Sequence, residues 1–228
     1  MKSIIVAIDG HSGCGKSSTA KEVARKLNFT YIDSGAMYRA AALYLKKLNI
    51  NPDETAKIGK GIPGIKIDFE LDADGNFITI LNGENVEKEI RSMEINNLVS
   101  RYSMIPKLRE VMVLNQRRLS QNRNVIMDGR DIGTIVFPNA DIKIFMTADL
   151  KVRALRRQKE LATQGKNENL YEVMQNLARR DEIDSTRESS PLIQATDAFV
   201  IDTTNLTMSQ QIEIVVNLVK ERMKEQKQ

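Results

Sequence analysis

An eight-residue segment, Gly10-His-Ser-Gly-Cys-Gly-Lys-Ser17, restricts the fold of this chain more than any other part of the sequence. Its spacing is that of a phosphate-binding loop, in which glycines let backbone N–H groups converge on phosphate oxygens. A buried-type strand, residues 4–8, precedes the loop, and residues 16–27 follow it with apolar side chains at helical spacing. Because the motif requires this strand and this helix, we expect a nucleoside triphosphate to bind here.

Two side chains of the loop have distinct chemical tasks in such a site. The Lys16 ammonium can reach the β- and γ-phosphates, and the Ser17 hydroxyl can ligate Mg²⁺. Asp128, at the end of a later buried-type strand, is the second predicted metal ligand. The residues predicted to hold the triphosphate are Gly10, His11, Ser12, Gly13, Cys14, Gly15, Lys16, Ser17 and Ser18.

The rest of the sequence separates the classes of protein that carry such a loop. A GTPase switch needs an Asn-Lys-x-Asp motif to read its base, and none is present. Asp72-Ala-Asp-Gly75 fits the D-x-x-G of such switches, but it lies in an expected hairpin turn, where Asp and Gly are common. A mechanical ATPase would end an apolar strand in Asp-Glu, whereas here Asp128 is followed by Gly129. The absence of a Glu to activate water favours a kinase.

Strands and helices alternate along most of the 228 residues, which predicts an α/β fold with a parallel sheet covered by helices. The sequence pattern changes in residues 52–92, where several glycines and Pro63 interrupt the chain. Two runs of alternating apolar and polar residues, 65–71 and 77–81, predict a β-hairpin there. We therefore expect a core of residues 1–51 and 93–228 with a small β-containing insertion at 52–92. The expected strands are 4–8, 31–32, 125–127, 142–146 and 199–201, and the expected helices are 16–27, 36–48, 95–102, 106–119, 150–161, 170–183 and 209–224.

The residue counts exclude several other classes of protein. A single cysteine, Cys14, excludes an intramolecular disulfide, and a single histidine, His11, argues against His-rich metal sites and a Ser-His-Asp triad. The net charge of +4 suits an anionic partner, while aromatic residues at 5% without Trp disfavour stacking on single-stranded nucleic acid. No apolar run approaches the ~18 residues of a membrane span, and the N-terminal one is too short for a signal peptide. We expect a cytoplasmic protein with no nucleic-acid or membrane partner.

Two polar segments follow core strands and should face one crevice at the carboxyl ends of the sheet. In Asp33-Ser-Gly-Ala-Met-Tyr-Arg39, we expect Ser34 to N-cap the next helix and Arg39 to offer its guanidinium to a phosphate, with a plain surface arginine as the alternative. The other segment, Asp128-Gly-Arg-Asp131, places two carboxylates around an arginine, and its alternative is a structural ion pair.

Residues 150–161 form an expected basic helix in which Arg153 and Arg157 share one face. A solvated surface helix is the alternative. Phosphoryl transfer, however, needs cations around the migrating group, and a mobile arginine-bearing lid also excludes water. We therefore predict a helical lid at about residues 150–182.

Taken together, these segments resemble the bacterial-type cytidylate kinase family of nucleoside monophosphate kinases. The phosphate-binding loop, Asp33-Ser-Gly-Ala-Met-Tyr-Arg39, Asp128-Gly-Arg-Asp-Ile-Gly-Thr134 and Arg180-Asp-Glu-Ile-Asp-Ser-Thr-Arg187 occur in order, and Pro191-Leu192, Asp197-Ala198 and Asp202-Thr-Thr204 extend the resemblance nearly to the end. Ser17-Ser18 stands where many members have Gly-Thr, which keeps a hydroxyl for the metal.

The resemblance implies transfer of the γ-phosphoryl group of ATP to CMP or dCMP with Mg²⁺, by a P-loop kinase core, an inserted monophosphate-binding domain and a lid. The family is usually monomeric. UMP, AMP or dTMP as acceptor, and a nucleic-acid-associated ATPase, are the alternatives. The implied catalytic residues are Lys16, Arg130, Arg153, Arg157 and Arg180. Substrate binding is implied for Ser34, Ser100, Arg109 and Asp131 around the cytosine, for Arg39, Arg130 and Arg180 at the acceptor phosphate, for Asp184 and Arg187 at the sugar, and for Tyr38.

Overall fold

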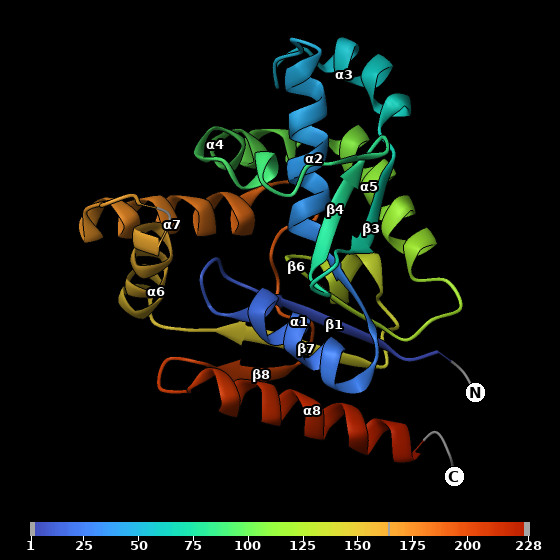
Figure 1. Ribbon diagram of the computed structural model, residues 1–228, viewed down its shortest axis with the longest axis vertical. Helices are drawn as coiled ribbons and strands as arrows, with labels where there is room; N and C mark the ends of the chain where they lie inside the picture. The colour runs from blue at the N-terminus through green and yellow to red at the C-terminus, as the bar shows by residue number, and fades with distance from the viewer. Residues whose placement is uncertain (1–2, 164, 226–228) are drawn as a thin grey trace. The chain divides into compact units, whose positions relative to one another are not determined.

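Strand β1 (Ile5–Gly10) is the central strand of a five-stranded sheet with the order β2-β6-β1-β7-β8. The arrangement is that of a computed structural model, which describes residues 3–163 and 165–225 (Figure 1). β1 pairs in parallel with β6 (Val125–Gly129) and β7 (Ile142–Thr147), and β7 pairs in parallel with β8 (Phe199–Asp202). The side chains in the middle of β1 are completely buried, which explains its unbroken apolar run.

The carboxyl end of β1 is a topological switch point, because the chain continues to β6 on one side of β1 and to β7 on the other. Ligands of open α/β sheets bind at such points. β2 (Thr30–Asp33) is an edge strand, and at its start the Thr30 N–H donates to the Asn124 carbonyl at 2.9 Å. The predicted α/β sheet is therefore confirmed, with the phosphate-binding loop at its switch point.

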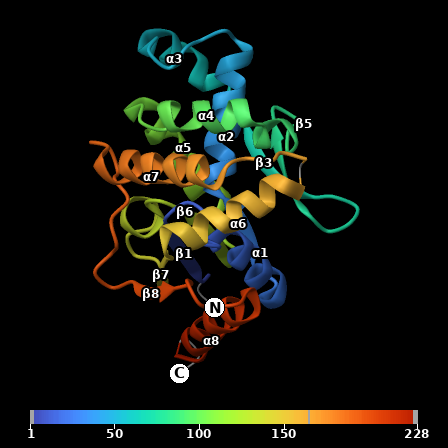
Figure 2. The same ribbon diagram turned by 90° about the vertical axis from the view of Figure 1, so that its left-hand side faces the viewer.

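The chain divides into two compact units, Met1–Tyr31 with Asn122–Gln228, and Ile32–Gln121. In the first unit, α8 runs alongside β8 and packs against α1 (Figure 1), while α6 and α7 pack on each other through an apolar cluster (Figure 2). The buried members of that cluster are Ala154, Leu161, Val173 and Leu177. The helices are α1 (Lys16–Leu27), α6 (Leu150–Thr163), α7 (Leu170–Thr186) and α8 (Met208–Glu225), with one π-helical turn, η3 (Ile132–Val136).

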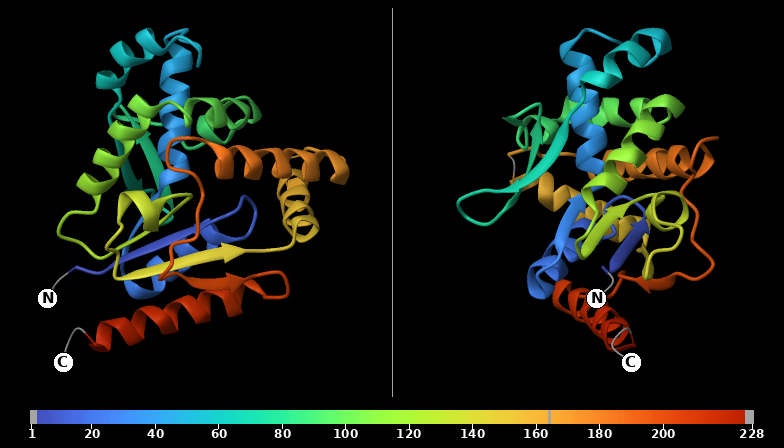
Figure 3. Two further views of the ribbon diagram at one scale, coloured as in Figure 1. Left: turned by 180° about the vertical axis from the view of Figure 1, so that it is seen from behind. Right: turned by 90° about the vertical axis from the view of Figure 1, so that its right-hand side faces the viewer.

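The second unit combines helices with a small antiparallel sheet of order β3-β4-β5 (Figure 3). Its central helix α2 packs on α4, α5 and β4. The elements are α2 (Ser34–Lys47), α3 (Thr55–Gly61), η1 (Ile62–Gly64), β3 (Ile67–Leu71), β4 (Phe77–Leu81), β5 (Glu84–Asn85), η2 (Glu89–Arg91), α4 (Met93–Tyr102) and α5 (Pro106–Leu119). The small sheet lies within the predicted insertion 52–92, whose boundaries stay a prediction.

The predicted hairpin is confirmed, with Leu71 opposite Phe77 and Ile67 opposite Leu81. In its turn, the Asp72 carboxylate accepts hydrogen bonds from the backbone N–H groups of Asp74 and Asn76. This Asx-type turn gives the D-x-x-G motif a local structural role.

Two details of the expected secondary structure were wrong. Asp33, one residue before Ser34, is the N-cap of α2, because its Oδ1 accepts the Ala36 N–H at 2.7 Å. Helix α3 was not expected, since its glycines disfavour a helix. The complete burial of Ile58 shows that tertiary packing overrides this local preference. Within the described residues, none of the helices combines the length and apolar sequence of a membrane span.

Gly10 is fixed by a close approach of two strands. Its φ is +148°, and a Cβ atom there would lie 1.9 Å from the Met146 carbonyl oxygen. We expect Gly10→Ala to lower the free energy of unfolding by about 3 kcal/mol or more, because overpacking adds to backbone strain. Gly75→Ala is the matched control, since its φ of +74° is also positive but no atom lies within 4 Å. Urea unfolding should show a loss of only about 1 kcal/mol for this control, and equal losses would contradict the packing argument.

Candidate nucleotide site

The phosphate-binding loop joins β1 to α1 through left-handed glycines. Gly13 has a φ of +78° and Gly15 a φ of +95°, and Gly15 directly precedes α1. No side chain of the described residues caps the start of α1. The first N–H groups of this helix are therefore available to an anion, which the helix dipole also favours.

Lys16 lies inside the loop. Its side chain is buried, and its Nζ donates to the His11 carbonyl at 3.0 Å. Burial, and after it the positive charge of Arg130, lowers the pKa of Lys16. An ammonium held in this low-dielectric position interacts strongly with any phosphate that reaches the loop.

Ser17 and Asp128, the predicted metal ligands, lie side by side. The Ser17 hydroxyl donates to Asp128 Oδ2 at 2.6 Å, and the Tyr31 hydroxyl donates to Asp128 Oδ1 at 2.8 Å. This oxygen pair fits Mg²⁺, which prefers few protein oxygens and keeps waters and substrate phosphates as its other ligands. Residues 3–163 and 165–225 contain no cluster of three or more His, Cys, Asp or Glu side chains suited to a metal.

Two arginines of α6 reach the loop, Arg153 directly and Arg156 through Thr203. Arg153 donates to the Ser12 carbonyl at 3.1 Å and pairs with Asp181 of α7 at 2.5 Å, and Asp181 also accepts the Ser12 N–H at 3.4 Å. Arg156 donates to the Thr203 carbonyl at 2.6 Å, and the Thr203 hydroxyl donates to the Cys14 carbonyl at 2.8 Å.

The two predicted lid arginines differ in their surroundings. Arg153 is buried against the loop, whereas Arg157 is partly exposed and pairs with Glu160 at 2.8 Å. The structure therefore brings only Arg153 of the two to the phosphate-binding loop.

Four predicted substrate residues form one buried cluster in the first unit. Arg130 Nε pairs with Asp184 at 2.7 Å, while Arg187 lies 3.6 Å from Asp184 and 3.9 Å from Asp131. Burial alone would raise the pKa of Asp184, but Arg130, Arg187 and Arg180 lower it. Arg130 does form a structural ion pair, the alternative interpretation of residues 128–131, but its partner is Asp184 of α7 and not a carboxylate of that segment.

In the second unit, Asp33 lies between two guanidinium groups. Its Oδ2 pairs with Arg39 at 3.1 Å and with Arg91 at 3.0 Å. Arg91 also donates through Nε to Glu87 at 2.9 Å, and the Glu87 carboxylate accepts the Thr79 hydroxyl of β4 at 2.7 Å. The small sheet is thus connected to the start of α2 by a continuous polar chain.

Two of the remaining predicted substrate residues of this unit, Arg109 and Tyr38, are in contact, and Arg109 also binds the turn between α4 and α5. Arg109 is buried, its guanidinium carbon lies 5.3 Å from the centre of the Tyr38 ring, and its Nη1 donates to the Ser103 carbonyl at 3.0 Å. The Ser103 hydroxyl donates to the Ser100 carbonyl at 2.9 Å. Ser34 is buried in the first turn of α2. The cation–π contact holds Arg109 in a fixed orientation.

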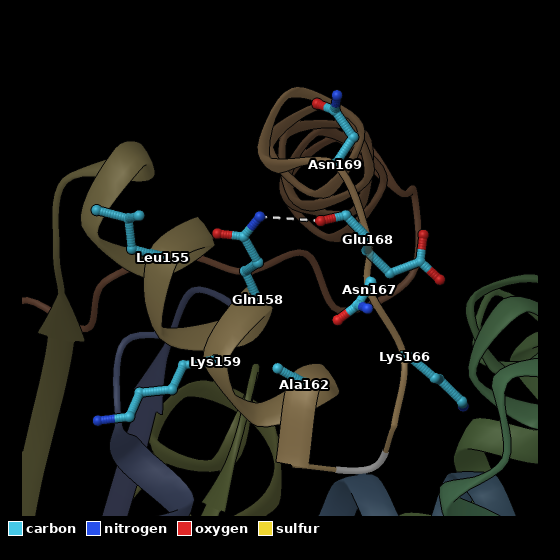
Figure 4. Close-up of a pocket in the computed structure, with 8 residues that line it drawn as sticks. All are labelled: Leu155, Gln158, Lys159, Ala162, Lys166, Asn167, Glu168 and Asn169. Carbon is cyan, nitrogen blue, oxygen red and sulfur yellow. Dashed lines mark hydrogen bonds between the residues drawn. The ribbon is translucent and has the colours of Figure 1, made fainter.

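A cavity of about 750 Å³ lies between α6 and residues 166–169 (Figure 4). Leu155, Ala162 and Lys166 are among its lining residues, and Gln158 Nε2 donates to the Glu168 carbonyl at 2.9 Å. No predicted site residue lines this cavity, so its volume does not mark the nucleotide site.

Sequence reasoning missed four residues that the site uses: Asp9, Arg91, Asp181 and Thr203. Asp9 ends the strand before the glycine-rich loop, and Asp181 follows Arg180, so their positions beside known motifs were a usable signal. Thr203 lies in Asp202-Thr-Thr204, which carries part of the resemblance but was given no role. Arg91 gave no signal, because its partner Asp33 is distant in the chain.

The fold and this site define a kinase of the P-loop class. The cytidylate kinase family matches residues 6–221, and the chain therefore belongs to the cytidylate kinase family. It is 47% identical over 224 residues to a cytidylate kinase of Cytophaga hutchinsonii, covering 98% of this chain and 96% of the relative. A cytidylate kinase of Fusobacterium nucleatum is 46% identical over 227 residues and is covered completely, as is this chain.

Among solved structures, an uncharacterized protein from Eubacterium ventriosum has a TM-score of 0.53 at 10% identity, covering 96% of this chain and 99% of that one. At this identity the likeness concerns the fold alone.

The paired Asp33 carboxylate makes stability depend on pH. Burial alone would raise its pKa, but Arg39 and Arg91 lower it to about 2. The carboxylate therefore stabilises the fold above the unfolded pKa of 3.8, and this contribution disappears as the pH falls toward 2. Asp33→Asn, which keeps the helix cap, should cost about 2 kcal/mol at pH 7 and roughly half of that at pH 3. Urea unfolding at both pH values measures this.

Asp53→Asn is the matched control in the same unit, because Asp53 is 81% exposed and pairs with Arg101 only at the surface. It should change stability much less at either pH. A pH-independent loss for Asp33→Asn would contradict the assigned charge pairing.

Proposed function

We propose that this kinase transfers the γ-phosphoryl group of ATP to CMP or dCMP through the residues assigned below, giving CDP or dCDP and ADP. The observation that carries the proposal is the phosphate-binding loop with buried Lys16 and the Ser17–Asp128 pair, in a chain of the cytidylate kinase family. The ATP phosphates bind the N–H groups of residues 10–18, and Lys16 turns from the His11 carbonyl to the β- and γ-phosphates.

Ser17 and Asp128 hold Mg²⁺ in this proposal. When bound, the metal ion neutralises charge on the β- and γ-phosphate oxygens. The Tyr31 hydroxyl fixes one oxygen of Asp128, so the carboxylate is oriented before any ligand arrives. Arg153, held at the Ser12 carbonyl, supplies positive charge for the migrating group, and Arg157 adds to it once its side chain leaves Glu160.

The acceptor needs no general base, because a phosphate oxygen of CMP is already anionic at neutral pH. Alignment and charge neutralisation therefore carry the rate. We assign the acceptor phosphate to Arg39, Arg130 and Arg180, and the sugar to Asp184 and Arg187. The ion pairs of Arg39 with Asp33 and of Arg130 with Asp184 support this, since they hold both guanidinium groups in place without a substrate.

Cytosine recognition is assigned to Arg109 and Asp131, with Ser34, Tyr38 and Ser100 around the base. Cytosine offers an N4 donor and acceptors at N3 and O2, which suit a carboxylate and a guanidinium, respectively. Uracil reverses the polarity at positions 3 and 4, and each unpaired buried group costs about 1–3 kcal/mol. Two mismatches would lower the kcat/KM for UMP, relative to that for CMP, by roughly two to four orders of magnitude.

A panel of monophosphates tests the function directly. With ATP and Mg²⁺, a coupled assay of ADP release should give a kcat/KM for CMP and dCMP about a hundredfold or more above that for UMP, AMP and dTMP. A higher value for another monophosphate would identify a different acceptor. ADP release at an equal rate without acceptor would identify an ATPase instead.

Arg109→Met tests the assigned base recognition. The variant should lose most CMP activity, and the CMP/UMP ratio of kcat/KM should narrow about tenfold or more, because the donor opposed to the uracil N3–H is removed. Arg118→Met is the matched control, as Arg118 lies exposed on the same helix and pairs with Asp68 at the surface, at 3.5 Å. A folded Arg109→Met variant with the wild-type ratio would show that the base is read elsewhere.

A further inference from the structure

Asp9 is the last side chain of β1 before the phosphate-binding loop, and it is 5% exposed. Its Oδ1 accepts the Ile132 N–H at 2.8 Å, and its Oδ2 accepts the Gly133 N–H at 2.7 Å. These two N–H groups begin η3, where the first donors of a helical turn have no acceptor within the helix. A carboxylate from the central strand thus caps a segment more than 120 residues away in the chain.

The capped segment carries acceptor-binding residues. Arg130 and Asp131 directly precede Ile132, and both belong to the buried cluster with Asp184 and Arg187. Because Asp131 is the N-cap residue of η3 and its carbonyl accepts the Ile135 N–H at 2.9 Å, the direction of η3 determines the path of the chain through both residues.

The packing around η3 leaves little room for adjustment. A Cβ atom on Gly133 would lie 3.2 Å from Lys143 Cδ and 3.4 Å from Asp9 Oδ2. Asp9 is itself held in register between Gly129 of β6 and Phe145 of β7. The carboxylate therefore binds η3 from a strand that cannot shift.

We propose that Asp9 is a positioning residue for the acceptor nucleotide, whose ionised carboxylate holds the start of η3 and thereby orients Arg130 and Asp131 toward CMP. This inference rests on the proposed function. Only an ionised carboxylate offers an acceptor to each of the two N–H groups, whereas an amide or a protonated carboxyl presents a donor to one of them. A small misorientation of binding groups is enough to weaken substrate binding and catalysis.

The Asp9 carboxyl should change its charge in a pH range close to neutral, where the enzyme can be assayed. Burial raises the pKa of Asp9 to about 6. The hydrogen bonds from the Gly133 and Ile132 N–H groups act in the opposite direction and lower this pKa. The charge of Asp131 raises it further, and the charge of Lys16 lowers it. Lys143 of β7 also packs on Gly133, but its ammonium pairs with Asp197 at 2.9 Å. As the pH falls through 6, Asp9 takes up a proton and one of its two acceptors becomes a donor.

Steady-state kinetics of wild type and Asp9→Asn at pH 8 and pH 5.5 test the proposal. The phosphate of CMP itself titrates near pH 6, so the measured quantity is the KM of the variant divided by the KM of wild type, in which this effect cancels. For CMP the ratio should be about tenfold or more at pH 8 and about three- to fourfold smaller at pH 5.5, where a group with a pKa of about 6 is mostly protonated. For ATP it should stay within about twofold at both pH values.

Asp141→Asn is the matched control, because Asp141 Oδ2 accepts the Ile5 N–H at 2.9 Å at the opposite end of the same strand. This variant should leave both KM values unchanged. A CMP ratio that is near one at pH 8, or equal at the two pH values, would overturn the proposal. Failure of wild type to phosphorylate CMP would overturn the proposed function, and with it the role proposed for Asp9.

An NMR titration of wild type keeps the proposal testable where Asp9→Asn does not fold. The amide proton shifts of Ile132 and Gly133 should follow one titration with a midpoint near that of Asp9, at about 6. Addition of CMP should depress this midpoint, because it binds the arrangement that the ionised carboxylate holds. Amide shifts that stay constant between pH 4.5 and 8, or a midpoint that CMP does not move, would overturn the proposal.

Discussion

The parallel pairing of β1 with β6 and β7 determines where the charged groups of the first unit can gather. The register places Ile8 opposite Asp128 and Asp9 opposite Gly129, so both strands release their chains at one edge of the sheet. Since parallel strands cannot be joined by tight turns, a long connection follows each strand. The first residues of the connections after β1 and β6 include polar side chains. The phosphate-binding loop, Arg130 and Asp131 all lie in these first residues.

Burial then makes ion pairs necessary, because an isolated charge in the interior carries a large desolvation cost. Arg130, Arg153 and Arg39 each have a carboxylate partner, from Asp184, Asp181 and Asp33. Folding has already removed these guanidinium groups from water and oriented them. A phosphate therefore meets positive charges that need little reorganisation, at the cost of weakening their contacts with carboxylates.

Much of the fold could be predicted from the sequence where the signal is local. The bounds expected for α1 and α5 agree with the structure, because apolar spacing defines α1 and Pro106 begins α5. The helix cap at Asp33 was placed one residue late, since Asp and Ser are nearly equal as caps. Helix α3 escaped prediction because only the tertiary burial of Ile58 supports it.

The candidate site divides in the same way. The loop residues and the Ser17–Asp128 pair could be named from motifs, because their chemistry depends on short spacings. The contacts of Asp9 with η3, and of Arg91 with Asp33, join residues 58 to 124 positions apart. No local pattern encodes such a contact, and only the folded chain shows it.

The close approach of Gly10 to Met146 limits changes in the length of β1. Inserting or deleting one residue in β1 would turn Asp9 to the opposite face of the sheet. It would also put a side chain at a position where only hydrogen fits. The segment from β1 through the loop should therefore tolerate changes of residue type far better than changes in length.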